Sequence, residues 1–145
     1  SNAGQKASGS AADDNTALGY QALQANASGS NNVAIGAYAL KSAHNVKDVI
    51  AIGRNTLGNL IESTAPLGTI AIGSAALKEL TSGAANVAIG KDSGKALTTG
   101  AHNTFLGTTT GDDMVEGSYN IAIGSDALGG AKDGTADSSQ FNIFM

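Results

Sequence analysis

The sequence contains no cysteine and no tryptophan, and its 145 residues include a single proline, Pro66. Without cysteine, disulfide frameworks and thiolate metal sites are both excluded. Charged residues make up 14% of the chain, well below the usual quarter, and the net charge is −4. The basic surface of a nucleic-acid binder is therefore missing, and no apolar run has the length of a membrane span. We expect no nucleic-acid partner and no direct membrane insertion by this chain.

Small side chains carry much of the apolar content. There are 20 glycines, about twice the usual share, and the apolar fraction of 41% includes many alanines. Such side chains fill a thin core rather than a thick one. We expect a single repeat domain over residues 4–145. Residues 1–3 are set aside because they resemble the remnant of a cleaved expression tag.

One short motif recurs through the chain, with the approximate form Asn-[Val/Ile/Thr]-Ala-[Ile/Leu]-Gly. Its closing glycines are spaced by 17, 17, 20, 17, 17 and 17 residues, and they are Gly19, Gly36, Gly53, Gly73, Gly90, Gly107 and Gly124. A unit of this length cannot bury a core alone, so each is predicted to form one coil of a stack. The closing residues 142–145 resemble the start of another coil. The prediction is therefore seven coils plus the start of an eighth.

The three residues before each glycine predict a β-strand, because they are apolar and often β-branched. Val33 and Ile35 share one face of such a strand, and Ala34 lies on the other. Apolar residues on both faces are typical of strands covered on both sides in parallel sheets. We predict that the larger side chains fill the coil and that the alanine face packs against another subunit. This predicted subunit face comprises Ala17, Ala34, Ala51, Ala71, Ala88, Phe105 and Ala122.

The fold class predicted from these patterns is mainly β, a parallel β-solenoid of 17-residue coils. The second arm of each coil has two interpretations. Residues 74–80 contain good helix formers, and Asp92 could cap a helix. Other arms are too rich in glycine for a helix, so short helical turns and short outer strands are alternatives.

Asparagine recurs at the position before the strand, at Asn15, Asn32, Asn86, Asn103 and Asn120. Stacked coils would place these side chains about 4.8 Å apart. Side-chain amides at that spacing can form a hydrogen-bonded ladder. The alternative is a local Asx turn that leads into each strand.

The motif N-x-[VIA]-A-[IL]-G resembles the head repeats of trimeric autotransporter adhesins, the YadA-like family. The segment TALGYQAL (16–23), followed by NNVAIGAYAL (31–40), is also similar to repeats of phage tail-fibre proteins. The resemblance covers residues 15–128. It implies a left-handed β-roll, three chains around a common axis, and display on a bacterial cell surface and outer membrane or on a virion tail. The family repeat is nearer fourteen residues, and the extra residues here lie outside the strand.

The sequence shows no catalytic constellation. His44 and His102 stand at different repeat positions, so they would not stack into a metal site. The acidic pairs at 13–14 and 112–113 lack the spacing of calcium-binding β-rolls. No phosphate loop or nucleophile elbow is present. We expect a chain that is not an enzyme and that uses no cofactor or metal.

These observations favour a surface-exposed adhesion or attachment module, a homotrimer that binds a host or matrix protein, a glycan or another cell. The alternative is a phage tail-fibre domain that acts as a rigid spacer or receptor-binding module. A solenoid enzyme would need carboxylates or basic residues converging on one face, and an ice-binding face would need a regular threonine array; the repeat positions hold neither.

The only internal irregularity among the seven motifs is three extra residues within 58–69. Insertions in solenoids leave the stack as loops, often on the binding face. The predicted partner contacts there are Leu60, Ile61 and Pro66. The alternative is that Leu60 and Ile61 fold back and cover the coil edge.

Overall fold

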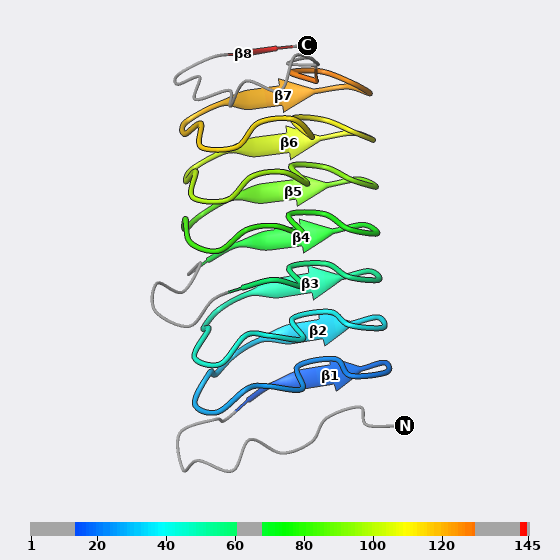
Figure 1. The fold of residues 1–145 in the computed structure, drawn as a ribbon, viewed down its shortest axis with the longest axis vertical. Helices are drawn as coiled ribbons and strands as arrows, with labels where there is room; N and C mark the ends of the chain where they lie inside the picture. Colours follow the sequence, from blue (N-terminus) through cyan, green and yellow to red (C-terminus); the bar gives the residue numbers. More distant parts are fainter. Residues whose placement is uncertain (1–13, 61–67, 130–142, 145) are drawn as a thin grey trace.

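The computed structural model describes residues 14–60, 68–129 and 143–144. The chain winds into a single stack of coils, each of which contributes one short strand (Figure 1). All strands lie in one parallel sheet in the order of the sequence. They are β1 (Thr16–Leu18), β2 (Val33–Ile35), β3 (Ile50–Ile52), β4 (Ile70–Ile72), β5 (Val87–Ile89), β6 (Thr104–Leu106), β7 (Ile121–Ile123) and β8 (Ile143–Phe144). The predicted β-solenoid is therefore confirmed.

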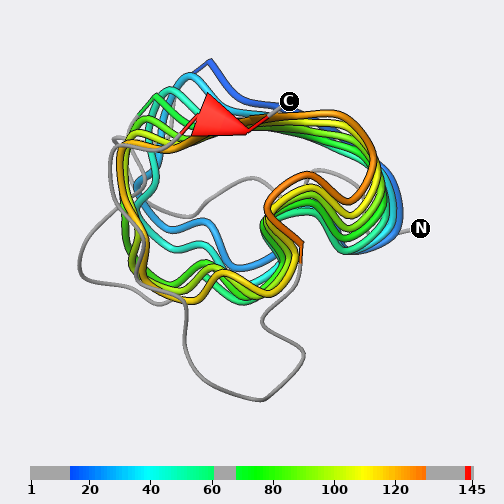
Figure 2. The same cartoon turned by 90° about the horizontal axis from the view of Figure 1, so that it is seen from above.

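The strand register follows the repeat. Ala17 pairs with Ala34, 17 residues later, and Ala51 pairs with Ala71, 20 residues later. The three extra residues therefore leave the sheet in register, as the clean return of the motif predicted. Seen along the stack, the coils superpose on a common outline, with the strand on one side and the second arm on the other (Figure 2). Ile143 pairs with Ile121, so an eighth strand does begin near the end of the sequence.

The second arm is built from turns, and the described residues contain no helix. The second and fourth residues after each closing glycine have left-handed backbone angles, as at Tyr38 (φ 63°) and Leu40 (φ 49°). Both helices and strands require negative φ, so this recurring conformation excludes the two predicted alternatives. Backbone hydrogen bonds instead run from coil to coil, as from the Tyr38 N–H to the Tyr20 carbonyl (2.8 Å) and from the Leu40 N–H to the Thr56 carbonyl (3.1 Å).

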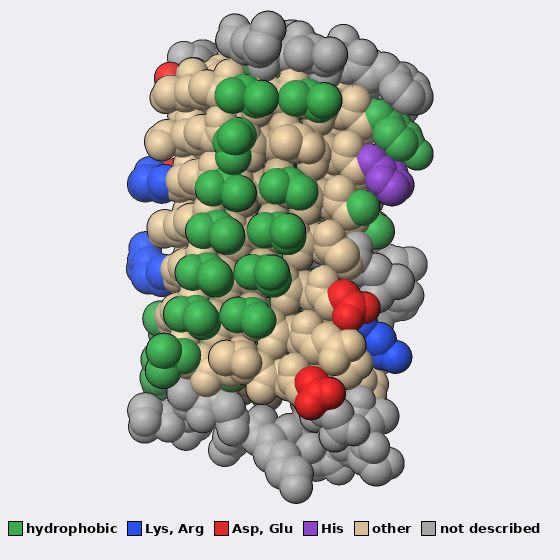
Figure 3. All heavy atoms as spheres, turned by 180° about the vertical axis from the view of Figure 1, so that it is seen from behind, with side chains coloured by type: hydrophobic (Ala, Val, Ile, Leu, Met, Phe, Trp, Pro, Cys, Tyr) green, Lys and Arg blue, Asp and Glu red, His purple; other side chains and the backbone are tan. Residues whose placement is uncertain are grey.

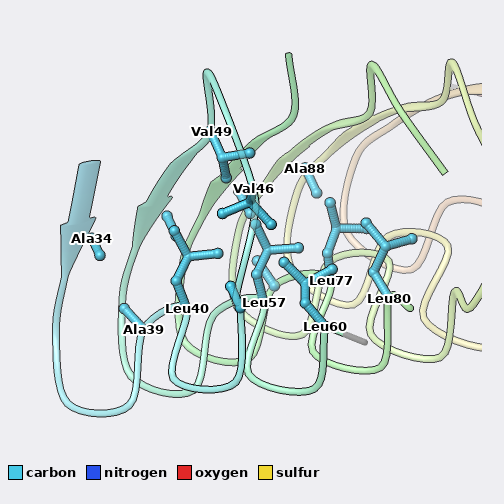
Figure 4. Packing of buried hydrophobic residues seen from close by; sticks show 14 of the residues in the cluster. Ala34, Ala39, Leu40, Val46, Val49, Leu57, Leu60, Leu77, Leu80 and Ala88 are labelled. Carbon is cyan, nitrogen blue, oxygen red and sulfur yellow. The ribbon is translucent and has the colours of Figure 1, made fainter. Parts of the chain in front are cut away.

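The strand faces are reversed relative to the prediction. The small residues point into the coil: Ala17 is partly buried against the core, and the others, Ala34, Ala51, Ala71, Ala88, Phe105 and Ala122, are fully buried within one chain. The alanine face therefore cannot be a subunit face. The reason is the leucine that five of the seven arms place beneath the strand, such as Leu40 or Leu57, which leaves room only for a methyl group (Figure 4). Val33 and Ile35 consequently lie on the outside of the coil.

The asparagine ladder is present. The Asn32 side-chain amide donates to Asn15 Oδ1 (3.0 Å), and Asn103 and Asn120 repeat this contact one coil apart (3.1 Å). The same oxygens accept backbone N–H groups, as in the bond from the Asn103 N–H to Asn86 Oδ1 (2.9 Å). The ladder stops where valine and threonine replace asparagine in the third and fourth coils. These buried amides join neighbouring coils on the strand side.

Close packing between coils requires glycine at six of the seven closing positions, all except Gly124. At Gly90, φ is +139°, and an added Cβ would lie 2.1 Å from the Gly107 carbonyl oxygen. A side chain there would collide with the backbone of the next coil as well as strain its own. These contacts agree with the structural role predicted for the glycine column, and at Gly124 only the positive φ remains as a reason for glycine.

Candidate interaction surface

The outward-facing first and third residues of β1 to β7 form a flat apolar strip, which we call the apolar sheet face (Figure 3). Its members are Thr16, Leu18, Val33, Ile35, Ile50, Ile52, Ile70, Ile72, Val87, Ile89, Thr104, Leu106, Ile121 and Ile123. Among its large hydrophobic side chains, the most exposed are Leu18 (64%), Ile123 (43%) and Leu106 (40%). The strip carries no charge, and the described part of the chain leaves it uncovered. Contiguous apolar surface of this kind marks an interaction site.

Two columns of side chains border this face. The leading column holds the residue two places before each strand: Asp14, Asn31, Asp48, Gly68, Ala85, His102 and Tyr119. The trailing column holds the second residue after each strand: Tyr20, Ala37, Arg54, Ser74, Lys91, Thr108 and Ser125. Because strand direction is the same in every coil, each column follows one long edge of the apolar sheet face.

The two columns carry opposite charges. Arg54 and Lys91 are exposed in the trailing column, and Asp14 and Asp48 are exposed in the leading column. Figure 3 shows basic side chains along one edge of the strip and acidic side chains along the other, where a basic side chain also lies beside them. Lys47, the residue before Asp48, is also exposed. The Asn31 amide donates to Asp48 Oδ1 (3.0 Å) and so holds that carboxylate in the leading column. The apolar sheet face is thus bordered by a cationic edge and an anionic edge.

Aromatic rings occupy one end of each column. His102 stacks on Tyr119 with ring centroids 4.9 Å apart and planes within 10°. Tyr20 meets Tyr38 edge to face, with ring centroids 5.4 Å apart. Tyr119 and Tyr20 are about half exposed. These rings extend the apolar surface beyond the strip at its two ends.

The second arms carry two polar hollows. In one, of about 330 Å³, Lys41 and Lys78 line opposite sides of Gly58. Lys78 also pairs with Glu79 (2.8 Å), and this contact lowers the pKa of the Glu79 carboxyl. The charge of Lys78 is therefore compensated, whereas Lys41 lies over the Tyr38 ring, with its Nζ 5.2 Å from the ring centroid.

The other hollow, of about 340 Å³, is acidic and is lined by Asp112, Asp113 and Asp126. Burial raises the pKa of Asp112, and the neighbouring charge of Asp113 raises it further. Within residues 14–60, 68–129 and 143–144, no group of three or more acidic, histidine or cysteine side chains has an arrangement that could hold a metal ion.

The predicted partner loop is only partly within the described structure. Leu60 is buried (2% exposed) in the core beside Leu80, so it is not available as a surface contact. Ile61 and Pro66 lie outside the described residues. The candidate interaction surface that the sequence did not reveal is the apolar sheet face. The small size of the alanine side chain was the available indication of this orientation, because alanine leaves room inside the coil for the leucine of the second arm.

Comparisons with protein-family models, with curated proteins and with solved structures give no match. The function of the chain is therefore inferred from its own surface. In the described residues, no helix is long and apolar enough to cross a membrane.

Proposed function

We propose that the chain is an attachment module that works as a homotrimer, with the apolar sheet face of each copy turned toward a common axis. Its setting is a bacterial cell surface or outer membrane, as in the heads of trimeric autotransporter adhesins. The observation that carries the proposal is the uncovered apolar sheet face. One chain buries the inward side of β2 to β7 and leaves the outward valine, isoleucine and leucine side chains partly or largely exposed.

The form of this face favours other copies of the same chain as its cover. It is a straight strip that repeats once per coil. A rotation about an axis parallel to the stack brings each apolar row against the equivalent row of the next copy. Three such strips can close around one axis, where each edge meets the opposite edge of a neighbour. In that arrangement the cationic and anionic columns meet.

The second arms would then face outward and provide the surface for attachment. They are polar, and they are held by hydrogen bonds from coil to coil, as from the Glu79 N–H to the Lys95 carbonyl (3.2 Å). A host or matrix protein or a glycan is the proposed class of partner. The same continuous hydrogen bonding favours a second candidate, a rigid spacer or receptor-binding segment of a phage tail fibre on a virion.

Attachment is tested by binding of the assembled protein to panels of immobilised matrix proteins and glycans. Three linked copies raise apparent affinity through avidity. We expect the wild-type protein to bind a panel member, and the face variant Ile72→Asp to lose most of that binding as it dissociates. Thr99→Asp adds the same charge on an exposed part of the second arm and should remain assembled and bound. Absence of wild-type binding to any panel member would favour the spacer role.

A further inference from the structure

We infer that the copies associate parallel and in register, and that Arg54 of each copy pairs with Asp48 of the partner subunit. The inference rests on the proposed homotrimer and assigns the contact that sets its alignment. The inference follows from three features of the leading and trailing columns. The first is the coil to which each charged residue belongs, and the second is which charges already pair within one chain. The third is the size of the side chains that would meet in the other coils.

Asp48 and Arg54 belong to the same coil but lie at opposite edges of the apolar sheet face. Asp48 stands two residues before β3, and Arg54 stands two residues after it. Arg54 follows Asp48 by six residues, three of which form β3, so the two lie up to about 20 Å apart, at about 3.3 Å per extended residue. No ion pair joins them within one chain. Rotation about an axis parallel to the stack places the trailing edge of one copy beside the leading edge of the next at the same level. Each Arg54 then meets Asp48 of the partner subunit.

The two groups suit this contact. Arg54 is exposed, and it forms no ion pair with any of the described residues. Its planar guanidinium presents several N–H donors to one carboxylate. The Asn31 amide binds one oxygen of Asp48 and orients the carboxylate. A carboxylate accepts several hydrogen bonds, so Asp48 keeps acceptor capacity for an arginine.

Side-chain sizes agree with the same alignment at other coils. At the level of β7, Tyr119 would meet Ser125, and at the level of β5, Lys91 would meet Ala85. In both cases a large side chain in one column faces a small one in the other. In-register association therefore avoids steric conflict at these two levels.

The antiparallel alternative brings like charges together. If two faces met with the stack direction reversed and all seven rows paired, β3 would oppose β5 and each trailing column would meet its own equivalent. Arg54 would then lie beside Lys91 of the partner subunit. Lys91 pairs with Asp92 of its own chain, which weakens this repulsion, but the reversed alignment gives Arg54 no uncompensated acidic partner.

Charge reversal tests the pair. Arg54→Asp and Asp48→Arg each place like charges together at all three subunit contacts of the trimer. We expect each to raise the protein concentration at which half of the trimer dissociates at least about tenfold. The double variant Arg54→Asp/Asp48→Arg restores opposite charges and should return close to wild type. Lys41→Asp and Glu116→Arg, on the second arm, make the same changes of charge away from the columns and should assemble normally. Failure of the double variant to recover, with a trimeric wild type, would overturn the pair while leaving the proposed function intact.

Cysteine cross-linking tests the alignment directly, because the natural chain contains no cysteine. Under oxidation, Arg54→Cys/Asp48→Cys should yield a covalent species of about three times the 14.2 kDa chain mass. Within one chain these positions are too far apart for a disulfide, which needs Cα atoms within about 7 Å. Arg54→Cys/Lys91→Cys should remain uncross-linked. Cross-linking of this second variant, with none of the first, would show antiparallel packing and overturn the inference.

Discussion

The ring of Phe105 occupies the space that a side chain at Gly94 would need. A Cβ added to Gly94 would lie 2.8 Å from Phe105 Cδ2, and one added to Gly111 would lie 2.8 Å from Phe105 Cε1. The five other coils carry alanine at the strand position and leucine at the arm position. One phenylalanine and two glycines thus replace the usual alanine and leucines, and the coil interior stays filled.

Phe105→Ala should lower the free energy of unfolding by about 3–5 kcal/mol, because neither glycine can fill the space left by the ring. The triple variant Phe105→Ala/Gly94→Leu/Gly111→Leu restores the usual residues and should recover much of that loss. Leucine is tolerated at this backbone position, since Leu77 has a φ of 48° there. Urea denaturation measures both effects. A triple variant less stable than the single one would show that the exchange is not compensatory.

Two glycine substitutions separate backbone strain from contact between coils. Gly90 and Gly124 both have positive φ, but only Gly90 has a neighbouring carbonyl where a Cβ would go. Gly124→Ala should lower the free energy of unfolding by about 1–3 kcal/mol through backbone strain. Gly90→Ala should lower it by at least about 1–3 kcal/mol more, because the new Cβ overlaps the backbone of the next coil. Thermal and urea unfolding would measure the difference. Equal losses would mean that the coils can move apart at Gly90 without penalty.

The asparagine ladder predicts that one substitution lowers the stability of the fold and that another raises it. Asn103→Ala leaves the buried N–H of Asn120 and the carbonyl of Gly117 without their side-chain partner, so stability should fall by at least about 3 kcal/mol. Thr69→Asn extends the ladder toward Asn86, where the Thr69 hydroxyl has no hydrogen-bond partner in the described part of the chain. A gain of about 1 kcal/mol is expected. Chemical denaturation of both variants checks the signs, and loss of stability in Thr69→Asn would argue against the ladder as a stabilising unit.

Asp112 predicts a pH effect. Burial and neighbouring acids raise its pKa in the folded chain above the usual 3.8, so the folded state holds this proton more tightly than the unfolded state. Ionisation of Asp112 therefore destabilises the fold as the pH rises through the folded pKa. Asp112→Asn should raise the melting temperature near neutral pH, by less than about 1 kcal/mol in free energy, and the gain should vanish below the usual pKa. A gain that persists unchanged at low pH would assign it to another cause.

Repetition made the stack and its register predictable, because spacing and strand alternation need no knowledge of what lies across the coil. The orientation of the strand was not predictable in the same way. Val33 and Ala34 are both apolar, so the pattern alone does not say which one faces inward. The deciding group is Leu40, whose left-handed backbone turns its side chain under the strand. That conformation is unusual for leucine and has no signature in local sequence.

The charged columns were hidden for a related reason. Asp48 and Arg54 do not belong to the repeated motif, and they stand on opposite edges of one coil. Their relationship emerges only when the apolar sheet face is known to point outward.

The most direct test of the account is the mass of the protein in solution, measured by light scattering after size exclusion. The wild-type chain should have about three times the 14.2 kDa chain mass at micromolar concentration. Ile72→Asp should shift the protein to monomer with its strands intact by circular dichroism, because it places an unpaired charge in the apolar sheet face. A wild-type protein that is monomeric at these concentrations would contradict the proposed assembly and the function built on it.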